Sequence, residues 1–135
     1  MDLTTLNRQH QEIRAQVKEI ELALTPENST NNAFDLSMKI SRLAGLISIH
    51  LKTEDDHLYP KLKAQSDEKV RKIAEQFSQE MGGIAQAFTD YKNNYRIVSG
   101  IKANPAKFIK DTTDILKALK KRVSNEDKIL YPLLK

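Results

Sequence analysis

The chain has 135 residues, 39% hydrophobic and 30% charged, with a formal net charge of +4, and this length fits one domain over residues 1–135. Cysteine is absent, which excludes disulfides, thiolate metal sites and cysteine nucleophiles and is expected of a cytoplasmic protein. Basic residues alternate with acidic ones, and we recognise neither a signal peptide nor a long apolar run, so we expect no nucleic-acid partner and no membrane partner.

The first two predicted elements are helices, over about residues 3–24 and 34–62. Their apolar side chains recur at alternating steps of three and four, which places them on one face of each helix. Turn-forming residues at 26–32 predict a loop between them. Polar residues interrupt both apolar faces, namely His10 in the first helix and His50 and Glu54 in the second.

Two further helices are predicted, over about residues 67–97 and from Asn104 onward. A tight turn at 64–66 precedes the third helix, with Ser66 as its expected N-cap. A loop at 99–104 precedes the fourth helix, in which Asn104 is the expected N-cap and a proline takes the first helical position.

Four amphipathic helices joined by short connections indicate an all-α fold, and we predict an up-down-up-down antiparallel four-helix bundle. Strand patterns are essentially missing from the sequence. Pro60 and Pro132 lie near the ends of the second and fourth helices. Each should kink or tighten the last turn, because proline lacks a backbone donor.

Five polar residues fall at positions that the periodicity assigns to the core. They are His10, His50, Glu54, Arg122 and Glu126. A buried charge without a partner is costly, so these groups should meet one another. His50 with Glu54, and Arg122 with Glu126, are four residues apart and therefore share a helix face. Since mid-helix positions of an antiparallel bundle can meet at one level, we predict a single polar cluster.

The second and fourth helices also resemble each other. Residues 50–63 align with residues 122–135, so that Glu54 matches Glu126 and His50 matches Arg122. Both segments continue into a Leu-Tyr-Pro sequence, at residues 58–60 and 130–132. The two helices are therefore predicted to occupy equivalent places around a shared centre.

These motifs resemble the hemerythrin-like (HHE) cation-binding family over nearly the whole chain. The resemblance rests on residues 6–13 around His10, on His50-Leu-Lys-Thr-Glu54 leading into Leu-Tyr-Pro, and on Glu126 leading into the second Leu-Tyr-Pro. It implies a bundle that holds two oxygen-bridged irons. His10, His50, Glu54 and Glu126 match family ligand positions, with the two histidines on one metal and the two glutamates as bridges.

Two positions depart from the family pattern. Met81 stands where the third helix should supply a histidine, and Arg122 stands where the fourth should supply one. A thioether is a poor ligand for iron or manganese, and a guanidinium is not a ligand. We therefore predict a degenerate di-iron site, in which Arg122 contacts carboxylates and stands in for the second metal.

Two functions remain open at this point. One is a module with at most one non-haem ion, iron or else manganese or zinc, which senses or binds metal or a small ligand such as O2 or NO. The other is a metal-free helical module without a cofactor, whose function lies in protein interaction or regulation with an unidentified partner. We rank an enzyme last and expect none, because no nucleophile–base pair or glycine-rich phosphate loop is recognisable.

The remaining histidine, His57, follows Glu54 at the spacing of the ferritin-like di-iron motif. The matching position of the fourth helix is Ile129, so the second copy of that motif is absent. We expect His57 to lie on the surface or behind the ligands, near the end of the bundle.

Overall fold

The computed structural model describes residues 3–134. Its helices are α1 (Thr4–Ala23), α2 (Pro26–Asn31), α3 (Ala33–Thr53), α4 (Tyr59–Lys63), α5 (Glu68–Tyr95), α6 (Val98–Ala103) and α7 (Pro105–Asn125). Two π-helical turns, Glu54–Leu58 and Glu126–Leu130, and a 3-10 turn, Tyr131–Leu133, complete the helical structure of the described residues. The all-helical prediction is confirmed.

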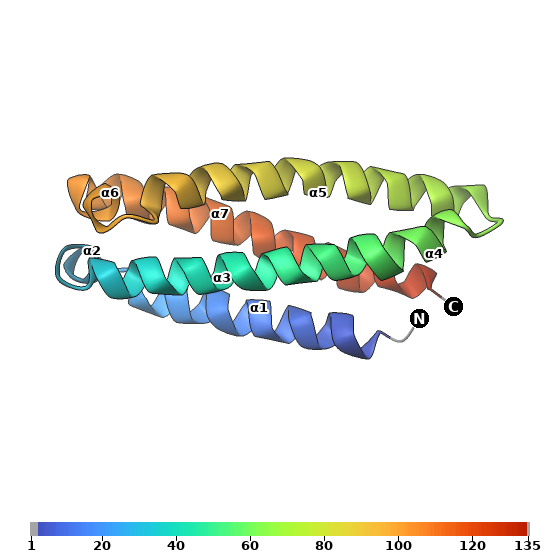
Figure 1. Ribbon diagram of the computed structural model, residues 1–135, viewed down its shortest axis with the longest axis horizontal. Helices are drawn as coiled ribbons and strands as arrows, with labels where there is room; N and C mark the ends of the chain where they lie inside the picture. The colour runs from blue at the N-terminus through green and yellow to red at the C-terminus, as the bar shows by residue number, and fades with distance from the viewer. Residues whose placement is uncertain (1–2, 135) are drawn as a thin grey trace.

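The four long helices α1, α3, α5 and α7 run along the long axis of the molecule (Figure 1). The short helices α2 and α6 lie together at one end, and α4 lies at the other end, near both ends of the described chain. The fold is thus a helical bundle, although the chain is divided into more helices than the four predicted.

The loops predicted at 26–32 and 99–104 are wrong, because each contains a short helix. In α2, the side chain of Thr25 caps the first turn by accepting a hydrogen bond from the backbone N–H of Asn28, at 3.1 Å. In α6, Ile101 is fully buried, so tertiary packing stabilises a helix that local sequence does not signal.

The start of α7 is confirmed, and the predicted start of α5 needs a correction. Asn104 caps α7 by accepting a hydrogen bond from the backbone N–H of Lys107, at 3.1 Å. The cap of α5 is Asp67 and not Ser66, because the Asp67 side chain accepts from the backbone N–H of Lys69, at 2.9 Å. A carboxylate at this place also complements the positive end of the helix dipole.

Two apolar clusters form the core on either side of a polar layer. The larger cluster lies toward α2 and α6 and includes the fully or almost fully buried Leu36, Ile40, Phe108 and Leu116. The smaller lies toward α4 and includes the fully buried Leu6, Leu58, Leu62 and Leu130. Burial of each such side chain stabilises the folded state by about 1.5–3 kcal/mol. This offsets the cost of burying the charged groups of the layer between the clusters.

The two segments that resemble each other in sequence also share a backbone feature, a π-helical turn. The N–H of Tyr59 bonds the carbonyl of Glu54, and the N–H of Tyr131 bonds the carbonyl of Glu126. A proline follows each tyrosine and lacks the donor that would continue the α-helical pattern. The predicted tightening is found only at the second proline, where residues Tyr131–Leu133 form a 3-10 turn. Just before each Tyr-Pro pair the helix is instead wider than an α-helix, because it forms a π turn.

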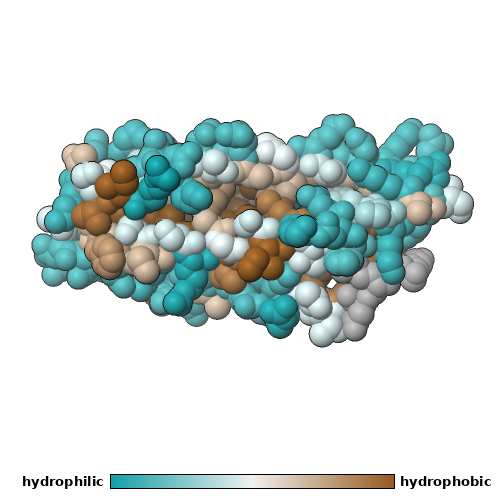
Figure 2. Space-filling view, in the orientation of Figure 1, coloured by the Kyte–Doolittle hydropathy of each residue, from teal (hydrophilic) through white to brown (hydrophobic). Residues whose placement is uncertain are grey.

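The visible face in Figure 2 is mostly hydrophilic, with apolar patches near the α2 and α6 end and over the middle of α3. The large apolar side chains with the highest exposure among the described residues are Leu22, Phe34, Met38, Ile49, Ile97 and Ile129. Within the described chain, no helix combines the length and the apolar character that a membrane crossing requires.

Candidate metal centre

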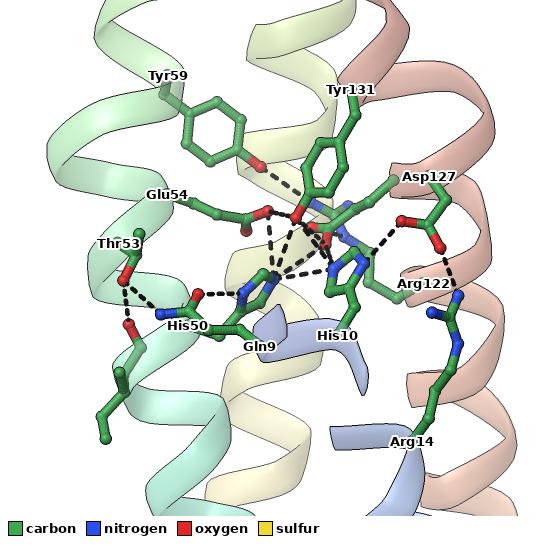
Figure 3. A network of polar contacts seen from close by, with 12 residues as sticks. Gln9, His10, Arg14, His50, Thr53, Glu54, Tyr59, Arg122, Asp127 and Tyr131 are labelled. Atoms are coloured by element: carbon green, nitrogen blue, oxygen red, sulfur yellow. Dashed lines mark hydrogen bonds and ion pairs between the residues drawn. The ribbon is translucent and has the colours of Figure 1, made fainter. Parts of the chain in front are cut away.

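Four side chains from the two halves of the chain meet in the polar layer. They are His10 from α1, His50 from α3, and Glu54 and Glu126 from the first residues of the two π turns. One nitrogen or oxygen atom of each lies within 4.8 Å of the others. All four side chains are buried. Figure 3 shows the side chains of His10, His50 and Glu54 pointing toward one another. The structure therefore brings together all four residues that were predicted as metal ligands.

The inner nitrogens of the two imidazoles face each other. His10 Nε2 lies 3.1 Å from His50 Nε2, and both face the same carboxylate oxygen, Oε1 of Glu126, at 2.8 and 3.2 Å. His50 Nε2 is also 3.3 Å from Oε2 of Glu54. Two nitrogens and two carboxylates thus converge on one point.

The outer nitrogens are held by acceptors, which fixes the tautomer of each ring. His10 Nδ1 lies 2.8 Å from Oδ1 of Asp127, and His50 Nδ1 lies 2.8 Å from Oε1 of Gln9. Carboxylate and amide oxygens only accept, so each Nδ1 carries the proton and each Nε2 of a neutral ring presents a lone pair. This is the orientation of a metal-binding histidine.

Further contacts hold these two acceptors in place. Arg14 pairs with the second carboxylate oxygen of Asp127. The amide nitrogen of Gln9 donates to the hydroxyl of Thr53, at 2.9 Å, while that hydroxyl donates to the carbonyl of Ile49. The hydroxyl therefore faces Gln9 as an acceptor, which directs the amide oxygen of Gln9 toward His50 (Figure 3).

The two carboxylates differ in their environment. Burial raises the pKa of Glu126, but hydrogen bonding with His10 and His50, whose Nε2 atoms donate when the rings are protonated, and the charge of Arg122 outweigh this and hold the pKa well below its usual range. Burial raises the pKa of Glu54, despite its hydrogen bond with His50. Glu54 Oε2 accepts from the hydroxyl of Tyr131 at 2.9 Å, whereas Oε1 is buried without a hydrogen-bond partner among the described residues.

Arg122 points into the polar layer, as predicted, and its side chain is only 5% exposed. Its Nε donates to Oε2 of Glu126 at 3.0 Å, and its Nη2 donates to the hydroxyl of Tyr59 at 2.9 Å. The guanidinium lies 4.7 Å from the centre of the Phe77 ring, a cation–π distance. The positive charge therefore sits on the side of Glu126 away from the histidines.

The remaining predicted positions, Met81 and His57, add no ligand group to this cluster. Met81 is buried on α5 and adds no nitrogen or carboxylate to the centre. The residues of α5 that approach Arg122 are Phe77 and Glu80, and Glu80 is 4.0 Å from Nη1. His57 is exposed and does not belong to the converging group, which agrees with the surface position predicted for it.

Sequence reasoning missed four residues that contact the centre: Gln9, Tyr59, Asp127 and Tyr131. The two tyrosines carried a signal, because both belong to the Leu-Tyr-Pro repeat. Gln9 and Asp127 carried a weaker signal. Each lies beside a predicted core residue at the edge of the apolar face, and Gln9 is three residues after Leu6 and four before Ile13.

The residues present fit one cation. Two facing Nε2 lone pairs 3.1 Å apart, a carboxylate with a low pKa and a buried Glu54 oxygen without a partner all gain from a positive charge between them. Imidazole nitrogen combined with carboxylate oxygen suits iron, manganese or zinc. The chemistry available here is thus the binding of a non-haem ion by neutral histidines and glutamates.

An all-helical bundle with buried histidines and glutamates at its centre is the architecture of a metal-binding helical protein. The family model described as the hemerythrin HHE cation binding domain matches residues 1–134. The chain therefore belongs to the hemerythrin HHE cation-binding family, as its motifs predicted. Comparisons with curated proteins and with solved structures gave no significant match.

Proposed function

We propose that this protein binds a single non-haem metal ion on His10, His50, Glu54 and Glu126. Iron is the first candidate, with manganese and zinc as alternatives. The observation that carries the proposal is the arrangement of the two imidazoles: each outer nitrogen is held by an oxygen acceptor, and each inner nitrogen faces the common point. Holding the rings in this way prepares the site for a metal.

In this proposal, Arg122 replaces the second metal of the family, so that the di-iron site is partly lost. Glu54 and Glu126, when ionised, bring two negative charges into the layer, and Arg122 neutralises one of them. A divalent ion on the histidine side neutralises the other. We interpret α1, α3 with α4, α5, and α7 as the four members of the family's up-down-up-down bundle.

The role that fits such a site is binding, as a sensor of metal or of a small gaseous ligand such as O2 or NO, without catalysis. Two histidines and carboxylates on a single ion can leave coordination positions open for such a ligand. We place the protein in the cytoplasm, consistent with its lack of cysteine.

A metal-free module is the second candidate, and one observation favours it. Burial lowers the pKa of His50, but hydrogen bonds with Glu126 and Glu54 outweigh this and raise it to about 9. With the pKa of Glu54 also raised, protons on His50 and Glu54 can take the place of the ion. The polar layer then serves as a buried ion network that supports an interaction surface.

Metal analysis of the protein purified in the presence of iron separates the two candidates. We expect about one ion per chain, and a rise in thermal stability when the ion is added to the stripped protein. His50→Ala should lose the ion, whereas His57→Ala, which changes the exposed histidine, should keep it. Less than about a tenth of an ion per chain, with no stabilisation by iron, manganese or zinc, would exclude metal binding.

A further inference from the structure

The two Leu-Tyr-Pro segments direct both tyrosine hydroxyls into the polar layer. Tyr59 and Tyr131 follow the two π turns and are 5% and 3% exposed. The hydroxyl oxygen of Tyr59 lies 2.9 Å from Nη2 of Arg122. In the first repeat, the tyrosine therefore places its oxygen against a cation.

The hydroxyl of Tyr131 occupies the equivalent place on the histidine side. Its oxygen lies 3.0 Å from His10 Nε2 and 2.9 Å from Glu54 Oε2. It is also 3.5 Å from His50 Nε2 and 3.5 Å from Glu126 Oε1. One oxygen is thus within 3.5 Å of an atom from each of the four candidate ligands. In Figure 3, the hydroxyl of Tyr131 points toward His10, His50 and Glu54.

The ring of Tyr131 is held so that this oxygen stays at the centre. It stacks on the imidazole of His10, with ring centroids 5.0 Å apart and planes inclined by 16°. Tyr131 also contributes to the lining of an open surface groove of about 320 Å³, together with Asn7, Arg14 and Asp127.

From this geometry we infer that Tyr131 is a fifth protein ligand, whose phenolate oxygen binds the same ion as His10, His50, Glu54 and Glu126, and that the site therefore favours ferric iron. The inference rests on the proposed metal site. Coordination replaces the phenol O–H bond with an oxygen–metal bond, and the proton leaves to solvent. No oxidant is needed when iron is supplied in the ferric state.

The donor types support ferric iron. Phenolate, Glu54 and Glu126 carry three negative charges, and Arg122 neutralises one of them. A divalent ion brings the sum to zero and a trivalent ion brings it to +1, so the preference for ferric iron rests on the anionic oxygen donors, which suit a hard cation. In the alternative, Tyr131 only donates a hydrogen bond to Glu54 and never contacts the ion.

A ferric–phenolate bond has a spectroscopic signature that separates these roles. The wild-type protein, stripped and reloaded with ferric iron, should show an intense visible charge-transfer band and resonance Raman modes of the phenolate ring. Tyr131→Phe should keep iron but lose the band, while Tyr59→Phe, the matched change in the first repeat, should keep both. Loading with zinc should give no visible band.

Isotope labelling keeps the test valid if Tyr131→Phe does not fold. The chain has four tyrosines, and Tyr91 and Tyr95 bond Thr112 and Asp111, away from the centre. When the Tyr59→Phe variant is produced with ring-deuterated tyrosine, the phenolate Raman modes should therefore shift, and the shift is assigned to Tyr131. Bound ferric iron without a band, or a band that survives Tyr131→Phe, overturns the inference and leaves the metal site intact. Failure of the wild type to bind iron, zinc or manganese overturns the metal site itself.

Discussion

At the scale of single residues, the polar layer depends on contacts behind the histidines as much as on the histidines themselves. Asp127 and Gln9 hold the outer nitrogens, and Arg14 and Thr53 hold those two in turn. A ring that lost its acceptor could rotate or exchange tautomers, and its inner nitrogen would no longer present a lone pair to the ion.

Asp127→Asn should weaken metal binding by about 10–100-fold, because the imidazole of His10 loses its anionic partner. Competition titration with a chelating dye measures this affinity. The matched control is Asp55→Asn, which changes the equivalent aspartate of the first repeat, an exposed side chain. Equal affinities for Asp127→Asn and Asp55→Asn would show that Asp127 has no role in the site.

Arg122→Leu should destabilise the metal-free protein by about 3–5 kcal/mol, because Glu126 stays buried beside an apolar side chain. Urea unfolding gives the free energy. Lys121→Ala, one residue earlier and exposed, should change stability by less than about 0.5 kcal/mol. Near-neutral stability of Arg122→Leu would mean that the guanidinium does not compensate the carboxylates.

The metal-free protein should lose stability as the pH rises from neutrality toward 9. The pKa of His50 is raised from 6.5 to about 9, so the charged imidazole contributes stability that is fully present below pH 6.5 and is lost through pH 9. The metal-loaded protein binds neutral histidine and should not show this loss. Free energies of unfolding of both forms, across that range, give the comparison; a flat curve for the metal-free form would contradict the raised pKa.

At the scale of elements, the π turns and the short helices position the site and the ends of the bundle. A π turn begins at each glutamate and ends just before each Tyr-Pro pair. Both glutamates and both tyrosines therefore place their side chains in the same polar layer. Helix α6 closes the opposite end by packing Gly100 against the last turn of α5. A Cβ on Gly100 would overlap the carbonyl oxygen of Asn94.

Two glycine substitutions test this close approach. Gly100→Ala should destabilise the protein by about 1–3 kcal/mol, because α6 must shift away from α5. Gly83→Ala, in the middle of α5, adds a methyl group into open space and should stabilise by about 0.5–1 kcal/mol. Thermal unfolding of both variants provides the measurement. Stabilisation by Gly100→Ala would show that α6 is not packed as described.

At the scale of the whole molecule, the apolar period predicted the helical bundle and the inward position of the charged residues. It succeeded because each long helix carries its own pattern, so that His10, His50, Glu54 and Glu126 could be assigned to the core without knowledge of their partners. Their role as ligands stays a proposal. The apolar period did not predict the short helices within residues 26–32 and 99–104. The first is stabilised by the cap of Thr25, and the second by the burial of Ile101.

The same period could not predict which neighbours of a ligand reach the centre. Asp127 lies next to Glu126 at the start of a π turn, and the altered turn directs its carboxylate toward His10. The π turn itself ends two residues before Pro132, which lacks a backbone donor, and the apolar period does not signal such a turn. Helical spacing places Asp127 and Gln9 only at the edge of the apolar face, so it does not show that either side chain reaches a histidine.

In the proposed function the bundle holds one ion, because Arg122 fills the place of the second. The most direct measurement is the Mössbauer spectrum and iron content of the protein loaded with ⁵⁷Fe. One mononuclear, magnetically isolated iron per chain is the predicted result. A spin-coupled pair of oxygen-bridged irons, or no bound iron at all, would contradict the claim.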